Sequence, residues 1–120
     1  MKIPGPDHPI TIAPNPKRVR VVFNGRAVAD TRAALTLKEA NLPPVQYVPR
    51  DDADMSLFAR TTNATYCPYK GAAAYYSLEV DGRMSENAVW TYEAPYPAMA
   101  QIKDHLAFYS SRVDRIEETP

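Results

Sequence analysis

Apolar and polar residues alternate through two adjacent short segments near the start of the chain. In Arg18–Phe23, valines alternate with arginines before a short apolar run, which is typical of a strand that buries one face. Asn24-Gly25 follows, and both residues tolerate the positive φ angles of a type I′ turn. Arg26–Thr31 then supplies the partner strand. The pattern therefore predicts a β-hairpin over these three segments.

Short segments with strand character occupy most of the remaining chain. They are Ala33–Leu37, Val45–Val48, Met55–Ala59, Thr62–Tyr66, Phe108–Tyr109 and Arg112–Ile116. Lys38–Ala40 is predicted as a short helical turn, and Ala98–His105 as a helix because its apolar residues recur at helical spacing. Glu117–Pro120 is predicted as an exposed tail. We therefore expect a mainly antiparallel β protein with one or two short helices.

The longest alternating segment predicts a second hairpin, Ala72–Tyr92, which turns at Asp81-Gly82. A two-residue turn would place Leu78 opposite Ser85 and mix polar and apolar residues on each face. A three-residue loop, Val80–Gly82, shifts the pairing by one position. Because a one-residue slip turns every side chain to the other face, the hydrophobic pattern favours the three-residue loop.

This register gives the second hairpin one apolar face. Its members are Ala74, Tyr76, Leu78, Met84, Ala88, Trp90 and Tyr92. Glu86 falls among them, near Tyr76. An ionised carboxylate on an inward face is costly without a partner. Glu86 is therefore paired, protonated or beside an opening, or else it lies at the sheet edge with its carboxylate in solvent.

The first 16 residues are rich in proline. Five of the 12 prolines lie here: Pro4, Pro6, Pro9, Pro14 and Pro16. Each proline removes a backbone donor and fixes φ, so we expect no regular strand pairing across them. The segment 1–16 is predicted as an extended arm that packs along the domain or against a second subunit. Because one core fills at about 100–150 residues, residues 1–120 are predicted to form a single domain.

The charge balance limits the classes of partner. The 14 basic residues match the 14 acidic ones, so no overall field attracts nucleic acid or an anionic membrane. The one basic cluster, Lys17–Arg20, alternates with apolar residues and is interpreted as the exposed side of a strand. No apolar run approaches the about 18 residues of a membrane span, and no signal peptide is evident. We predict a cytoplasmic protein without nucleic-acid or membrane partners.

The candidate metal ligands form no recognisable set. The acidic loop Arg50–Asp54 lacks the later glycine and glutamate of an EF-hand, so it is interpreted as a solvated turn. Cys67 is the single cysteine, whereas a structural zinc site needs four ligands. Cys67 would be a nucleophile only beside a base or a cation, such as His105 if the fold brings it close, and a buried inert thiol is favoured. No metal and no cofactor are predicted.

Candidate chemistry is densest in Tyr66–Tyr76, which holds the cysteine, Lys70 and four of the eight tyrosines. Gly71 would allow a ligand or a second backbone to approach Lys70 closely. Lys70 is suited to bind a phosphate or carboxylate, or to form a Schiff base if burial lowers its pKa. The alternative is an ion pair with Glu39 or Glu86 that joins two sheets.

Nearly the whole chain, from Pro4 onward, resembles the sequence of a known family. The residues that carry the resemblance are Gly25, Glu39, Tyr47, Pro49, Tyr66–Gly71, Ala74, Tyr76, Trp90–Glu93, Pro95, Phe108 and Tyr109. On these residues the chain resembles the bacterial and fungal domain-of-unknown-function family 427, which is also labelled a nucleotidyltransferase-type domain. The resemblance implies a β-tent fold, in which two antiparallel sheets meet at an angle around a cleft.

Two features associated with this resemblance, a zinc site and transferase activity, need residues that this sequence lacks. Many β-tent relatives hold zinc through paired Cys-x-x-Cys motifs, but this sequence has only Cys67. The transferase label requires a Gly-Ser pair with spaced aspartates, or a phosphate-binding glycine loop, and neither is present. The resemblance therefore predicts a fold without assigning a reaction.

Three classes of function follow from the sequence. The first is a module that binds a small molecule in an aromatic cleft, with Lys70 fixing an anionic group. The residues predicted to bind the ligand are Tyr47, Tyr66, Cys67, Lys70, Tyr76, Trp90 and Tyr92. The second is an enzyme that uses Lys70 with Glu39 or Glu86 as an acid/base pair. The third is a structural domain that forms a homodimer through the N-terminal arm or a sheet edge.

Overall fold

The computed structural model describes residues 1–120 and contains ten strands and four short 3-10 segments. The strands are β1 Ile10–Pro14, β2 Arg18–Phe23, β3 Arg26–Thr31, β4 Leu35–Glu39, β5 Val45–Tyr47, β6 Phe58–Cys67, β7 Gly71–Val80, β8 Arg83–Thr91, β9 Leu106–Phe108 and β10 Arg115–Thr119. The 3-10 segments are η1 Arg50–Asp52, η2 Met55–Leu57, η3 Pro97–Ile102 and η4 Ser110–Arg112. The mainly β prediction is confirmed. No helix has the length and apolar character needed to cross a membrane.

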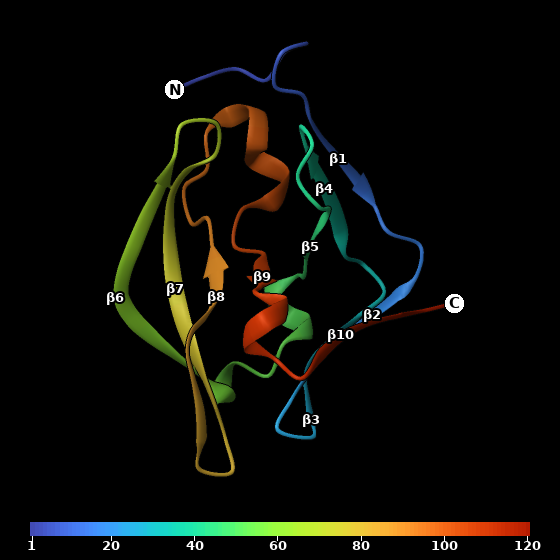
Figure 1. Cartoon of the computed structure of the whole chain (residues 1–120), viewed down its shortest axis with the longest axis vertical. Helices are drawn as coiled ribbons and strands as arrows, with labels where there is room; N and C mark the ends of the chain where they lie inside the picture. The colour runs from blue at the N-terminus through green and yellow to red at the C-terminus, as the bar shows by residue number, and fades with distance from the viewer.

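The strands form three antiparallel sheets, with the orders β6-β7-β8-β9, β1-β4-β5 and β10-β2-β3. The four-stranded sheet lies on one side of the molecule, and the two smaller sheets lie opposite it (Figure 1). Reciprocal backbone hydrogen bonds of 2.8 Å between Val48 and Leu106 join the end of β5 to β9. The antiparallel architecture is as predicted, with three sheets instead of two, while the β-tent grouping stays a prediction.

The first hairpin forms as the sequence predicts. Asn24 and Gly25 have φ angles of 50° and 75°, as a type I′ turn requires. On the outer side of β2, Arg18 makes two hydrogen bonds to the Asp30 carboxylate, at 2.8 and 2.5 Å. The basic cluster is therefore the outer side of a strand, as expected, and its charge is partly neutralised within its own sheet.

The proline-rich arm contains a strand, contrary to the prediction that no regular pairing crosses it. In β1, Ile10 pairs with Glu39 and Pro14 pairs with Leu35 of β4. Because β1 is an edge strand, a proline at its end disrupts few hydrogen bonds. This pairing keeps β4 extended through Glu39, where a helical turn was predicted, and Ala40 ends the strand with a φ of 47°.

Three further segments differ from the prediction because tertiary pairing overrides local pattern. Of the two strands predicted in Met55–Tyr66, Met55–Leu57 forms η2, and the rest belongs to the single strand β6, which has an irregular register between Arg60 and Ala64. The predicted helix is the shorter η3, with non-helical backbone angles at Met99. The predicted exposed tail is largely β10, which pairs with β2.

The turn of the second hairpin has two residues, so the predicted three-residue loop is wrong. Val80 pairs with Arg83, and the turn residues Asp81 and Gly82 have φ angles of 50° and 81°. Both angles fit a type I′ turn. The resulting pairing of Leu78 with Ser85 is the one that the hydrophobic pattern disfavoured.

An irregularity in β8 explains why the hydrophobic pattern predicted the wrong register for the second hairpin. The register shifts between Tyr76 and Leu78, where Glu86–Ala88 form a bulge that contains Asn87 in the left-handed region at φ 49°. The Ser77 hydroxyl accepts a 3.0 Å hydrogen bond from the Asn87 backbone N–H, and Arg112 donates to the Asn87 carbonyl oxygen at 2.9 Å. The bulge changes which side chains share a face beyond it.

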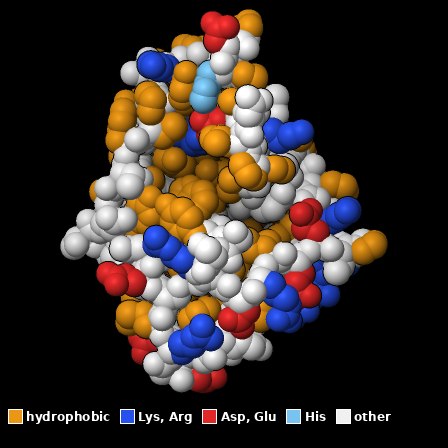
Figure 2. Space-filling view, in the orientation of Figure 1, with side chains coloured by type: hydrophobic (Ala, Val, Ile, Leu, Met, Phe, Trp, Pro, Cys, Tyr) orange, Lys and Arg blue, Asp and Glu red, His pale blue; other side chains and the backbone are white.

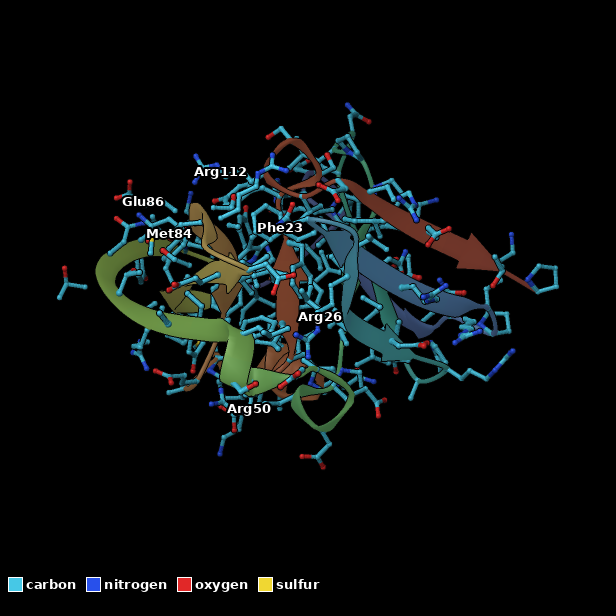
Figure 3. All side chains as sticks on the ribbon, turned by 90° about the horizontal axis from the view of Figure 1, so that it is seen from below. Phe23, Arg26, Arg50, Met84, Glu86 and Arg112 are labelled. Atoms are coloured by element: carbon cyan, nitrogen blue, oxygen red, sulfur yellow. The ribbon has the colours of Figure 1, made fainter.

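The bulge separates residues that were predicted to lie together. Tyr75 pairs with Trp90 and Tyr76 pairs with Val89, so Tyr76 and Trp90 lie on opposite faces. Met84, predicted on the apolar face, is exposed. Figure 3 shows Met84 and Glu86 on the outer side of β8, away from the centre of the molecule. Glu86 is exposed, which agrees with the alternative that places its carboxylate in solvent.

The buried side chains form two clusters on opposite faces of β7. The first, which we call the apolar core, contains Val21, Phe23, Val28, Ala29, Val48, Tyr76, Leu78, Val80, Ala88, Val89, Leu106 and Phe108. The second, which we call the tyrosine core, contains Leu37, Tyr47, Ala73, Tyr75, Tyr92, Met99, Ile102 and Ala107. The tyrosine core lies between the four-stranded sheet and β4-β5.

Candidate functional site

A cleft of about 400 Å³ opens beside the tyrosine core. It is lined by Leu37, Glu39, Leu42, Pro43, Val45, Tyr47, Thr65, Lys70, Tyr75, Trp90, Tyr92 and Tyr109. One wall comes from β6, β7, β8 and the segments next to them, and the other comes from β4, β5 and the loop that joins them. Figure 2 shows a hydrophobic hollow in the middle of this face of the molecule.

A buried ion pair lines the cleft. Lys70, which is 6% exposed, donates through Nζ to the Glu39 carboxylate. Lys70 sits in the turn between β6 and β7, where Gly71 adopts a φ of 110°, and Glu39 is the last residue of β4. The pair therefore joins two sheets. This is the arrangement expected from the alternative in which Lys70 forms an ion pair with Glu39 or Glu86.

His8 completes this polar group from the N-terminal arm. Its Nε2 atom lies 2.7 Å from Glu39 Oε2, and its ring stacks on Tyr69 with the centroids 4.2 Å apart. His8 was not predicted as a site residue because 31 residues separate it from Glu39. The available signal was the strand that begins two residues later, since β1 pairs Ile10 with Glu39.

The hydrogen bonds around Glu39 control its ionisation. Burial alone would raise the pKa of this carboxyl, but the hydrogen bonds from Lys70 and His8 outweigh burial and lower the pKa below its ordinary value. Glu39 is therefore an anion at neutral pH. It can accept hydrogen bonds from a ligand, but it has no proton to donate.

Cys67 lies next to the ion pair. Its Sγ atom is 3.6 Å from Lys70 Nζ, and its side chain is partly buried. His105, the base considered for it, instead contacts the Lys103 carbonyl oxygen through Nδ1 at 3.0 Å. The structure therefore gives Cys67 a cationic neighbour but no histidine base.

Hydrogen bonds between side chains fix the aromatic walls of the cleft. The Tyr75 hydroxyl lies 2.9 Å from Thr65 Oγ1 and 3.2 Å from the Tyr109 hydroxyl. Trp90 Nε1 donates to the Tyr47 hydroxyl oxygen at 3.2 Å. Because the Tyr47 oxygen accepts this bond, its own proton remains available to a ligand.

Three phenols that line the cleft, those of Tyr47, Tyr92 and Tyr109, stay protonated at neutral pH. Burial raises the pKa of Tyr47 and of Tyr92. Burial, with a contribution from the hydrogen bond to Tyr75, raises the pKa of Tyr109 to about 12. Each phenol can therefore act as a hydrogen-bond donor in a largely apolar site.

The structure brings together some of the predicted site residues and separates others. Tyr47, Lys70, Trp90 and Tyr92 line the cleft, together with Glu39, and Cys67 contacts Lys70. The remaining three predicted residues are not among those that line it: Tyr66, Tyr76 and Glu86.

The three separated residues have other surroundings. Tyr66 is exposed and its hydroxyl lies 2.6 Å from that of Tyr96. Tyr76 belongs to the apolar core, and its hydroxyl accepts a 2.8 Å hydrogen bond from Arg50. Glu86 is exposed on the β8 bulge, so an acid/base pair of Glu86 with Lys70 is not formed.

Several residues of the cleft were not anticipated from the sequence. They are Leu37, Leu42, Pro43, Val45, Thr65, Tyr75 and Tyr109. Tyr75 and Trp90 line the same cleft because they are direct cross-strand partners, a pairing that depends on the bulge in β8. Leu42 and Pro43 from the loop after β4, and Val45 from β5, line the cleft because two sheets come together there. The sequence has no local signal for that contact.

No cluster of three or more His, Cys, Asp or Glu side chains is positioned to hold a metal ion. In the acidic loop, Asp52 accepts a 2.7 Å hydrogen bond from Thr31, and Asp54 accepts one from the Ser56 hydroxyl at 2.5 Å. These carboxylates therefore organise the turn around η1 and η2.

The comparison with curated proteins gives no match. The sequence model of one family, described as a domain of unknown function, DUF427, matches residues 11–119. The match covers nearly the whole chain, including the cleft and both cores. The chain therefore belongs to the DUF427 family.

Proposed function

We propose that this protein binds a small molecule in the cleft beside Lys70. The observation that carries the proposal is a cavity of about 400 Å³ with aromatic walls and one buried polar pair. Ligand pockets are typically about 300–1,000 Å³, mostly apolar, with a few well-placed polar groups. The cleft has this size, and eight of its 12 lining residues are hydrophobic.

The walls of the cleft are organised before any ligand arrives. The rings of Tyr47 and Trp90 meet edge to face, with centroids 6.4 Å apart, and Trp90 contacts Tyr109 at 4.6 Å. Each ring is also held by packing or by a hydrogen bond. Rigid aromatic walls lower the entropy cost of binding and suit a flat apolar group.

The polar pair supplies both kinds of hydrogen-bonding group. An ammonium group has three N–H donors, and Glu39 and Cys67 engage two of those on Lys70. Each oxygen of Glu39 accepts one bond, so the carboxylate retains further acceptor capacity. A ligand at this end of the cleft therefore meets a donor and an acceptor side by side.

The contact between Lys70 and Glu39 also leaves an acid/base enzyme as a second candidate. Such an enzyme would need one member of the pair to exchange a proton with the substrate. Glu39 is already held as an anion by two donors, and reaction would have to separate it from them. Binding uses the pair as it stands, so it is the function we propose.

The test is a thermal-shift screen against mixed metabolites with two matched variants. Thr65→Trp places a large side chain in the cleft from an exposed position of β6, whereas Ala59→Trp is an exposed control on the same strand. A ligand present at 100 times its dissociation constant stabilises the fold by about 2.7 kcal/mol. We expect hits that stabilise the wild type and Ala59→Trp but not Thr65→Trp.

Two results would contradict the proposal. One is a screen that yields no stabilising compound. The other is a set of hits that stabilise Thr65→Trp as strongly as the wild type, because such compounds bind outside the cleft. The melting temperatures of the unliganded variants establish first that both remain folded.

A further inference from the structure

A second cavity of about 500 Å³ adjoins the cleft. It is lined by Leu42, Pro43, Pro44, Val45, Gln46, Trp90, Phe108, Tyr109, Ser110, Ile116 and Glu118. Five of these residues also line the cleft: Leu42, Pro43, Val45, Trp90 and Tyr109. The two cavities therefore meet along a shared boundary, which we call the junction.

The junction has an apolar surface on both sides. Leu42, Pro43 and Val45 form one side, and the contacting rings of Trp90 and Tyr109 form the other. Leu42 is 59% exposed, so the protein itself leaves this apolar side chain largely uncovered. A ligand that crosses the junction would cover Leu42 and remove apolar surface from water.

The far end of the second cavity is also suited to an apolar group. Phe108 and Ile116 contribute apolar side chains there. The charged member, Glu118, accepts a 2.7 Å hydrogen bond from Asn15, which also donates to Gln46 at 3.0 Å. These polar groups already have protein partners, so a ligand entering the second cavity needs no charge to satisfy them.

The charges in the cleft favour an uncharged head group. Glu39 and Lys70 are the only charged residues that line it, and they are bonded to each other. An anion would gain from Lys70 but would be repelled by Glu39, and a cation would experience the reverse. A flat amide can accept from Lys70 and donate to Glu39 at the same time, without separating the pair.

We propose that the ligand is an uncharged amphipathic molecule, whose flat amide-like head binds the Lys70–Glu39 pair and whose apolar tail crosses the junction into the second cavity. This inference rests on the proposed small-molecule binding and specifies the ligand class. It replaces the anionic ligand expected from the sequence, because Lys70 is already paired with Glu39. Affinity should therefore depend on tail length and on the neutrality of the head.

A series of para-alkyl benzamides, from para-methyl to para-octyl, tests both features by isothermal calorimetry. Each buried methylene is worth about 0.8 kcal/mol, which corresponds to an increase in affinity of roughly fourfold. We expect this increase to continue along the series while the tail fills the second cavity. Benzoates and benzylammonium ions with the same tails should bind at least about tenfold more weakly, since each meets a like charge.

Two serine variants test where the tail goes. Ser110 lines the second cavity but not the cleft, whereas its neighbour Ser111 lines neither, and both are exposed in η4. Ser110→Trp should abolish the gain for long tails and leave the affinity for para-methyl benzamide unchanged. Ser111→Trp should follow the wild type along the whole series.

The outcomes separate this inference from the proposed function. If long tails bind no better than para-methyl benzamide, or if Ser110→Trp retains the full gain, the tail does not occupy the second cavity. If the charged analogues match the benzamides, or if no benzamide binds, the neutral amide-like head is wrong. In each case the proposed function survives when screening hits are still lost in Thr65→Trp, and it fails when they are not.

Discussion

The two faces of β7 support cores of different character. On one face, the apolar core consists mainly of aliphatic residues and phenylalanines, and it is further covered by partly buried residues that include Phe58 and Ile116. On the other face, three of the eight residues of the tyrosine core are tyrosines, and this core borders the cleft. β7 therefore contributes Tyr76 and Leu78 to a covered core and Tyr75 to an open site.

The difference shows how a small β protein can stabilise its fold and still keep a pocket. Tyrosine combines a large apolar ring with a polar hydroxyl, so it can pack like a core residue and still present a donor at a surface. The bulge at Glu86–Ala88 assigns the residues to their faces, because it aligns Trp90 with Tyr75 and Val89 with Tyr76. Closure of one face thereby coexists with an opening on the other.

The largest expected effect comes from a matched pair of leucine truncations, one in each core. Leu78 is 0% exposed in the apolar core, and Leu37 is 2% exposed in the tyrosine core and lines the cleft. Leu78→Ala should lower the free energy of unfolding by about 4 kcal/mol, since it leaves a closed void. Leu37→Ala should cost about 1–2 kcal/mol less, because the vacated space joins the open cleft.

Urea denaturation of the two leucine variants measures this contrast. Equal losses of unfolding free energy in Leu78→Ala and Leu37→Ala would show that the two cores are closed to the same degree. A larger loss in Leu37→Ala would reverse the comparison.

The next largest effect concerns the ion pair, which has no counterpart in the apolar core. Lys70→Met leaves the Glu39 carboxylate partly buried with only His8 as a partner, and removal of one member of a buried pair costs about 3–5 kcal/mol. We expect a loss near the lower end, about 3 kcal/mol, because Glu39 keeps its bond to His8. The free energy of unfolding from urea denaturation is the measurement.

The double variant Lys70→Met/Glu39→Gln is the control for this prediction. It removes both charges and keeps a hydrogen-bonding group for His8, so it should recover most of the stability lost in Lys70→Met. If the double variant is as unstable as the single one, the loss arises from packing of the lysine side chain and not from the unpaired carboxylate.

The parts of the fold that the sequence predicted are those with local signals. The turns at Asn24-Gly25 and Asp81-Gly82 were located because both dipeptides favour positive φ angles. The length of the second loop was wrong, since a bulge several residues from the turn changed the pattern used to choose the register. The pairing of β1 with β4 was missed because prolines hide an edge strand.

The candidate site was predictable only in part for a related reason. Lys70 was selected because it lies in Tyr66–Tyr76, which also holds the single cysteine and four of the eight tyrosines. Glu39 was named as its potential partner. Their contact joins two sheets and depends on the tertiary arrangement, as does the contact of His8 with Glu39. Trp90 was predicted on the same face as Tyr76, whereas the bulge pairs Trp90 with Tyr75 on the other face.

The smallest expected effect is a difference between the two cores in how their contribution to the free energy of unfolding depends on pH. The pKa of Glu39 is lowered in the folded protein, although burial opposes this, because Lys70 and His8 bond its ionised form. In the unfolded chain the carboxyl titrates near its ordinary value of 4.5. Its contribution to stability is therefore complete above that pH and is lost as the pH falls through the lower folded pKa. The apolar core contains no carboxylate and contributes no such dependence.

Denaturation of the wild type and Lys70→Met/Glu39→Gln, from about pH 6 down to about pH 3, isolates this contribution. Asp30, Asp54 and Asp114 also have a lowered pKa, but all three are common to both proteins, so their effects cancel in the difference. We expect the unfolding free energy of the wild type to fall more steeply than that of the variant below about pH 4.5. Parallel curves would mean that Lys70 and His8 do not stabilise the ionised form of Glu39 in the folded protein.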